Sequence, residues 1–144
     1  MVDLNNSDAL RAAAEQFFFA YRAFTSQPDR LLEQRGLGRV HHRILYFVGR
    51  HPKISVNTLL GILGVSKQAL NVPLRQLIES SLISVDLAEH DRRVKQLTLT
   101  DDGGALEEEL TSIQTRHLAA AFNEAGDEAA RGWLKVMAAI PGNV

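Results

Sequence analysis

The stretch from residue 55 to residue 100 changes its hydrophobic period once, and this change limits the folds open to the chain. Apolar residues recur at helical spacing in residues 56–63 and again in residues 70–78, with Gly64 between the two runs. From Ile83 onward apolar and polar residues alternate, which is the pattern of strands with one buried face. Because glycine readily adopts the left-handed conformation that ends many helices, Gly64 marks a turn. The stretch therefore predicts two short helices followed by a β-hairpin.

Two serines agree with these boundaries. Ser55 and Ser66 each precede one of the helical segments, and a serine hydroxyl accepts hydrogen bonds from the free N–H groups of a first turn. Two helices joined by a turn of about three residues form a helix-turn-helix. A hairpin with a charged loop at residues 89–93 follows at once. We predict a mainly α fold, a winged helix-turn-helix with a two-stranded β-wing.

Pro73 lies inside the second of these helices, which we expect to run from Lys67 to about Ser80. Proline has no N–H to bond the Ala69 carbonyl and its ring crowds that turn, at a cost of about 3 kcal/mol in a helix interior. We therefore expect either a kink at Pro73 or an early end to this helix.

Two helices are predicted before this stretch. Residues 8–26 carry a wide aromatic and apolar stripe at spacings of three and four, and Ser7 or Asp8 is placed to cap its start. Pro28 marks the end of this helix or a kink in it. Residues 40–50 form a second amphipathic helix. A first helix this apolar must bury its stripe against something, in the same subunit or in another.

Two more helices are predicted after the hairpin. Asp101 and Asp102 can cap a long helix that reaches about Asn123, because acidic residues favour a helix N-terminus. Gly126 separates it from a last helix near residues 128–139. No repeat or linker interrupts the sequence, so we expect a single domain over residues 1–144.

Composition excludes several classes of function. Cysteine is absent, which removes disulfides, thiolate metal sites and cysteine nucleophiles. The sequence holds no nucleophile elbow, phosphate-binding glycine loop or His-Glu-x-x-His motif, so we expect no enzyme and no cofactor. The first eight residues carry two acids and no base, unlike a secretory leader. No run of 18 apolar residues occurs. We therefore expect a cytoplasmic protein without membrane contact.

Charge is distributed unevenly along the chain. The formal net charge is −1 overall, but residues 30–95 carry +6, residues 1–29 carry −2 and residues 96–144 carry −5. A basic middle can meet phosphates, while acidic ends stay away from nucleic acid. This distribution favours a DNA-binding segment in the middle of the chain.

The wing and its exit carry the most specific resemblance. They read Asp91-Arg92-Arg93 at the tip, then an alternating strand, then Thr100-Asp101-Asp102-Gly103 at the next helix. This arrangement resembles the MarR family of bacterial transcriptional regulators, and the Leu63-Gly64-Val65-Ser66 turn and the Gly36-Leu37-Gly38 segment are similar as well. The resemblance covers essentially the whole chain. It implies a DNA-binding lobe at about residues 40–100 and dimerization helices at about residues 8–35 and 101–141.

Candidate DNA contacts lie on the second short helix and on the wing. The helix face opposite its leucines shows lysine, arginine, asparagine and glutamine, the residue types that pair with guanine and adenine in the major groove. In the family resembled, a wing-tip arginine enters the minor groove and the aspartate before it orients that arginine, which here implies Arg92 or Arg93 with Asp91 as the orienting residue. The predicted DNA contacts are Ser55, Ser66, Lys67, Gln68, Asn71, Arg75, Asp91, Arg92, Arg93 and Lys95.

A dimer and an effector are also expected. The helices that hold residues 17–19, all phenylalanine, and Trp133 are the candidate dimerization surfaces. Members of the family resembled often bind a small aromatic or phenolic ligand between the dimerization helices and the DNA-binding lobe. For this chain the resemblance implies a site at Phe17, Tyr21, Arg22, His41, His42 and Tyr46. Adjacent histidines on a helix point about 100° apart, so His41 and His42 do not predict a metal site.

Together these expectations describe a dimeric repressor that binds double-stranded DNA at a pseudo-palindromic operator, because helix-turn-helix dimers bind paired half-sites. A small aromatic ligand would release it. The alternative is a winged helix used only for protein–protein contacts, which Pro73 and the acidic flanks favour.

Overall fold

The computed structural model describes residue 3 and residues 5–143, and these form a mainly helical chain with one small sheet. The elements in chain order are α1 (Ser7–Glu33), α2 (Arg39–Arg50), β1 (Ile54–Ser55), α3 (Val56–Leu63), α4 (Lys67–Glu79), β2 (Ile83–Leu87), β3 (Lys95–Leu99), α5 (Asp101–Ala125), α6 (Asp127–Ala139) and the short 3-10 helix η1 (Pro141–Asn143).

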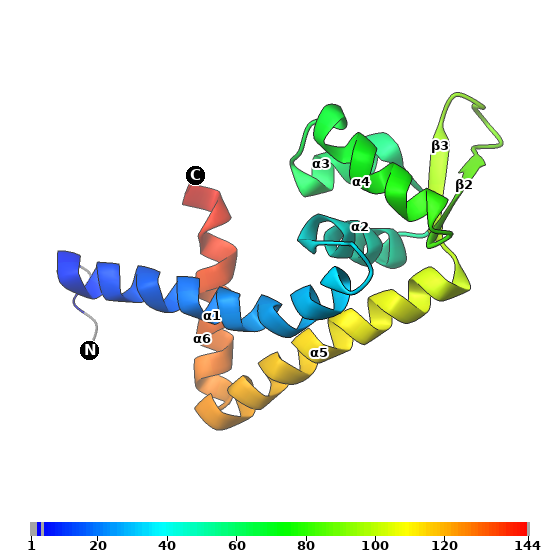
Figure 1. Cartoon of the computed structure of the whole chain (residues 1–144). Coiled ribbons are helices and arrows are strands. Elements are labelled where there is room, and N and C mark those ends of the chain that lie inside the picture. Colours follow the sequence, from blue (N-terminus) through cyan, green and yellow to red (C-terminus); the bar gives the residue numbers. More distant parts are fainter. Residues whose placement is uncertain (1–2, 4, 144) are drawn as a thin grey trace.

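The elements divide into a compact lobe and a set of extended helices (Figure 1). The winged-helix lobe, residues 39–99, contains α2, α3, α4 and the sheet, with the β2–β3 hairpin projecting from it. Helix α5 packs against α1 and α2 and leads away from the lobe to α6. This is the predicted winged helix-turn-helix with additional N- and C-terminal helices.

One apolar core holds the lobe together and extends onto the extended helices. Leucine and isoleucine side chains from α2, α3, α4 and the sheet are buried together, and Leu32 of α1 with Leu106 and Leu110 of α5 join them. In α4 the buried face consists of Leu70, Leu74 and Leu77, as the spacing predicts. The core therefore fixes which face of α4 points to solvent.

The sheet has three antiparallel strands in the order β1–β3–β2. In the predicted hairpin Ile83 lies opposite Leu99 and Leu87 lies opposite Lys95. The sequence did not predict β1, in which Ile54 pairs with Leu97, because a two-residue strand is too short to show an alternating pattern. It ties the entry to α3 to the middle of the wing.

The two prolines inside helices do not end them. Helix α1 continues through Pro28 to Glu33, so the prediction that it stops near residue 26 was wrong. Pro28 and Leu32 are buried, and their packing offsets the missing hydrogen bond. Helix α4 likewise continues through Pro73 to Glu79, so the early end proposed for it was also wrong.

Two predicted caps are corrected as well. Asn6, not Ser7 or Asp8, caps α1, because its side chain accepts from the Asp8 N–H at 2.9 Å. Thr100 caps α5 by accepting from the Gly103 N–H at 3.0 Å. Asp101 and Asp102 lie in the first turn of α5 instead, where their negative charges interact favourably with the helix dipole.

Among the helices of the described residues, none combines the length and apolar character that a membrane crossing requires.

Candidate nucleic-acid interface

The turn of the helix-turn-helix is set by Gly64 and Ser66. Gly64 adopts the left-handed conformation, with φ of 65°, and its N–H donates to the Leu60 carbonyl at 2.9 Å. Ser66 then caps α4 by accepting from the Ala69 N–H at 3.1 Å. These local contacts fix where α4 starts, and the buried leucines fix its rotation.

The predicted DNA-reading residues of α4 lie on its outer surface. Lys67, Gln68, Asn71 and Arg75 are all exposed. The salt bridges within the described part of the chain join Arg39 to Asp29 and Arg93 to Asp91. The cations of α4 are therefore available for an external anion.

The wing tip is ordered by Asp91. Its backbone carbonyl accepts from the Val94 N–H at 3.0 Å, and the Ala88 N–H donates to Val94 at 2.9 Å. Its carboxylate accepts from the Arg93 backbone N–H at 3.0 Å, from Nε at 3.1 Å and from Nη2 at 3.2 Å. The Arg93 side chain is nevertheless 91% exposed. The tip therefore presents a guanidinium that is oriented but open to solvent.

The charge state of this pair follows from the same contacts. The side-chain and backbone hydrogen bonds from Arg93 lower the pKa of Asp91, and the charge of His90 adds a smaller effect in the same direction. Asp91 is thus ionised at neutral pH. The sequence left open whether Arg92 or Arg93 is oriented, and the geometry selects Arg93, because Arg92 has no such contact among the described residues.

The remaining predicted contacts flank α4 and the wing. Ser55 caps α3, and its hydroxyl also donates to Thr58 Oγ1 at 2.8 Å, so its proton is already used. The Ser66 hydroxyl accepts from the Ala69 N–H, and its proton has no acceptor among the described residues. Lys95 is exposed at the start of β3. Ser66 and Lys95 therefore remain able to donate to an external anion.

Two buried histidines join α2 to neighbouring helices, His41 to α4 and His42 to α5, and sequence reasoning missed this role. The His41 ring accepts from the Gly38 N–H at 2.9 Å through Nδ1, so its proton lies on Nε2, which contacts Gln76 Oε1 of α4 at 2.7 Å. His42 Nε2 lies 3.3 Å from Thr111 Oγ1 of α5. Burial lowers the pKa of His42. The negative charge of Asp29 acts to raise this pKa, and the positive charge of Arg43 acts to lower it further.

The residues predicted for an effector site are not gathered in one place. Phe17, Tyr21 and Arg22 are exposed on α1. His41 and His42 are buried in the hydrogen bonds above. Tyr46 packs edge-on against the neighbouring Phe47 ring. That site stays a prediction. No cluster of three metal-ligating side chains occurs among the described residues.

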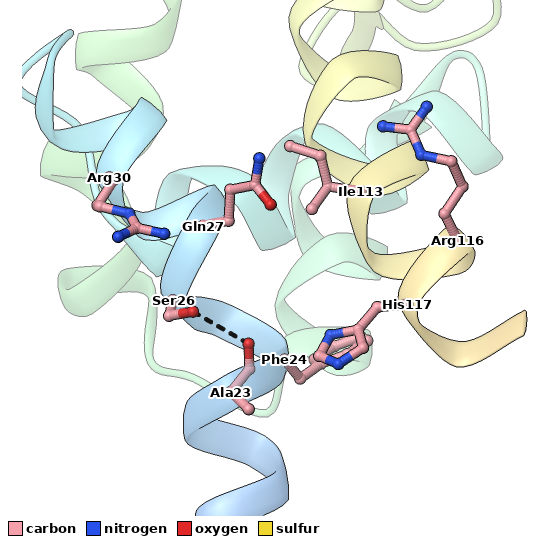
Figure 2. Close-up of a pocket in the computed structure, with 8 residues that line it drawn as sticks. All are labelled: Ala23, Phe24, Ser26, Gln27, Arg30, Ile113, Arg116 and His117. Atoms are coloured by element: carbon pink, nitrogen blue, oxygen red, sulfur yellow. Dashed lines mark hydrogen bonds between the residues drawn. The ribbon is translucent and has the colours of Figure 1, made fainter. Parts of the chain in front are cut away.

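An open cavity of about 420 Å³ lies between α1 and α5 instead. Figure 2 shows the side chains around it, which come from the second half of α1 and from the middle of α5. The lining combines two arginines and a histidine with apolar and neutral polar groups. The lining residues are Ala23, Phe24, Ser26, Gln27, Arg30, Ile113, Arg116 and His117.

Known proteins resemble this chain in sequence and in architecture. The sequence model of the MarR family matches residues 35–94. The HTH-type transcriptional regulator PetP of Rhodobacter capsulatus is 43% identical over 133 residues, which are 92% of this chain and 80% of PetP. The chain belongs to the MarR family.

Solved structures agree with this MarR-family fold. Streptococcus pneumoniae FabT in complex with DNA is similar with a TM-score of 0.82 at 15% identity, over 92% of this chain and 95% of FabT. The Staphylococcus aureus MepR–DNA complex is similar with a TM-score of 0.72 at 19% identity, over 91% of this chain and 97% of MepR. At these identities the likeness shows the fold, including the placement of α4 and the wing.

Proposed function

We propose that this MarR-family protein is a dimeric repressor that binds a pseudo-palindromic DNA operator. The observation that carries the proposal is the exposed Arg93 guanidinium, which Asp91 orients on the wing while α4 offers a polar face. FabT and MepR, which share this fold, were solved with DNA. We propose that the protein acts in the cytoplasm, where its DNA lies.

Each part of the surface has a task in this proposal. Helix α4 enters the major groove, where Lys67 and Arg75 suit guanine and Gln68 and Asn71 suit adenine. Arg93 enters the minor groove, whose negative potential is strongest where the groove is narrow. Of the remaining predicted contacts, Ser66, Arg92 and Lys95 bind phosphates, which fix the register without reading bases, whereas the Ser55 hydroxyl already donates to Thr58 and serves as the cap of α3.

A second copy of the chain completes the operator-binding unit. Phe17, Phe18 and Phe19 of α1 and Trp133 of α6 are large, apolar and at least 40% exposed in the single chain. A partner that buries them removes this apolar surface from water at roughly 25 cal/mol per Å². The same dimer places two copies of α4 on half-sites about one helical turn of DNA apart.

The alternative function loses its main support. A winged helix used only for protein contacts was favoured by the expectation that Pro73 disrupts the reading helix. Helix α4 is continuous through Pro73, and exposed polar residues lie on both sides of it. DNA binding is therefore the function that we propose.

The cavity between α1 and α5 is the place we propose for the effector. Its volume suits a small ligand, and Phe24 and Ile113 offer apolar contacts. Arg30 and Arg116 add positive charge, and no carboxylate belongs to the described lining. We therefore propose a small aromatic anion. Benzoate should weaken operator binding whereas uncharged benzamide should not, and Arg116→Ala should remove the difference. Equal effects of the two compounds would contradict the proposal.

The DNA-binding proposal is tested by fluorescence anisotropy with labelled DNA from upstream of the gene. Arg93→Ala should weaken binding at least tenfold, because an arginine that contacts bases contributes about 1–3 kcal/mol. Because the proposed dimer carries two copies of Arg93, the substitution should also lower the slope of log affinity against log salt by about two. Arg92→Ala is the matched control, with a smaller loss. Unchanged binding by Arg93→Ala would refute the wing assignment, and no binding by the wild type would refute the function.

A further inference from the structure

Val72 is a large apolar residue on an exposed and mainly polar surface of α4. It is 50% exposed in the middle of α4, on a face that is otherwise polar apart from the small Ala69. Residues three and four apart share a helix face, so Val72 lies between Gln68 and Arg75. The buried leucines of α4 lie on the opposite side. An apolar side chain therefore occupies the centre of the proposed DNA-reading surface.

Nothing in the described part of the chain accounts for this valine. It belongs neither to the buried core nor to the partly buried apolar residues around that core. β-Branched residues are also less favourable than most in a helix, because the preceding turn restricts their side chain. At an exposed helix position a polar residue or alanine would serve the fold as well. The reason for the valine therefore has to come from outside the chain.

The major groove offers one apolar group on its base edges, the C5-methyl of thymine. Every other recognition group there is a hydrogen-bond donor or acceptor. The stiff side chain of valine loses little conformational freedom on contact, and its exposed methyl groups match a thymine methyl in size and polarity. Val72 can thus discriminate thymine from cytosine, which carries only a hydrogen at C5 and so lacks the methyl group.

We propose that Val72 is a specificity-determining residue that contacts a thymine methyl in each half-site. The contacted T·A pair lies between the base pairs that Gln68 and Arg75 reach, because the three side chains form one row along α4. This inference rests on the proposed DNA binding and deepens it. It also assigns the apolar contact to one residue, whereas the other predicted base contacts are polar.

The test removes the methyl group from the DNA rather than from the protein. Each thymine of a footprinted operator half-site is replaced in turn by deoxyuridine, and anisotropy measures binding by the wild type and by Val72→Ala. Burying one methyl group corresponds to about a fourfold change in affinity. We expect one thymine whose replacement weakens wild-type binding about fourfold and leaves Val72→Ala nearly unaffected.

A matched control separates this contact from general apolar effects. Ile62 of α3 is 41% exposed and lies outside α4, so Ile62→Ala should keep the full deoxyuridine effect. The inference is overturned if no thymine is sensitive, or if Val72→Ala is as sensitive as the wild type. Operator binding by the wild type with either of these results would leave the proposed function intact. A wild type that binds no operator DNA would overturn both.

Discussion

Two adjacent glycines at the start of α5 should respond in opposite ways to the same substitution. A Cβ atom added at Gly103 would lie 1.9 Å from the Leu82 carbonyl oxygen and 2.8 Å from its carbon. A Cβ atom added at Gly104 meets nothing within 4 Å. Both glycines belong to the first turn of the same helix. Gly104→Ala is therefore the matched control for Gly103→Ala.

The expected magnitudes follow from these contacts. Relieving the Gly103 contact requires the backbone of α5 and that of Leu82 to move apart by more than an ångström. Such overpacking costs about 1–3 kcal/mol. The movement also strains the 3.1 Å hydrogen bond from the Thr100 N–H to the Leu82 carbonyl, worth about 1 kcal/mol. Alanine returns at most about 1 kcal/mol in helix propensity. We expect Gly103→Ala to lose about 2–3 kcal/mol.

Gly104→Ala should instead gain about 0.5–1 kcal/mol, since alanine restricts the unfolded chain. Urea denaturation gives both free energies of unfolding. Thermal unfolding should show Tm about 6–9 °C lower for Gly103→Ala, from about 3 °C per kcal/mol. All variants must be compared at one protein concentration, because the proposed dimerization would add to the stability. A Gly103→Ala protein as stable as the wild type would refute the argument.

Three further predictions concern charge, pH and assembly. Asp91→Asn should weaken operator binding less than Arg93→Ala, because the arginine stays but loses its charged partner; equal losses in anisotropy would contradict this. Because burial lowers the pKa of His42, the unfolded chain takes up a proton below about pH 6.5 where the folded chain does not. This contribution to stability is complete above that pH and declines below it. Urea denaturation at pH 7.5 and 5.5 should show the decline, and a His42→Gln variant with the same decline would exclude His42 as its cause. Phe18 is 63% exposed and lies in the proposed dimer interface. Phe18→Glu should therefore shift the sedimentation coefficient toward that of the monomer, whereas Ile62→Glu should leave it unchanged. A Phe18→Glu variant that stays dimeric would count against the proposed interface.

Local signals explain why the helix-turn-helix could be predicted from the sequence. Gly64 and Ser66 act on their own turns, through a left-handed backbone and a cap, so their effect is visible without the rest of the chain. Pro28 misled the prediction because its effect depends on distant packing. The burial of Leu32 keeps α1 helical beyond the proline.

The site could be predicted less completely for a similar reason. Arg92 and Arg93 are adjacent and equivalent in the sequence, and only the folded tip determines which one Asp91 reaches. His41 looked like a polar group for a ligand. The fold instead places it against Gly38 and Gln76, a contact between residues 35 positions apart that periodicity does not reveal.

Helix α5 connects the wing directly to the far helices. Its start is fastened to the hairpin, because the Thr100 hydroxyl donates to the Ser81 carbonyl at 2.7 Å, and its other end contacts α6. With 25 residues it is about 37 Å long. A tilt of about 5° over that length moves the opposite end by about 3 Å, close to the rise of one base pair. Small angular changes near the chain ends therefore suffice to shift the wing by a whole step along a DNA groove.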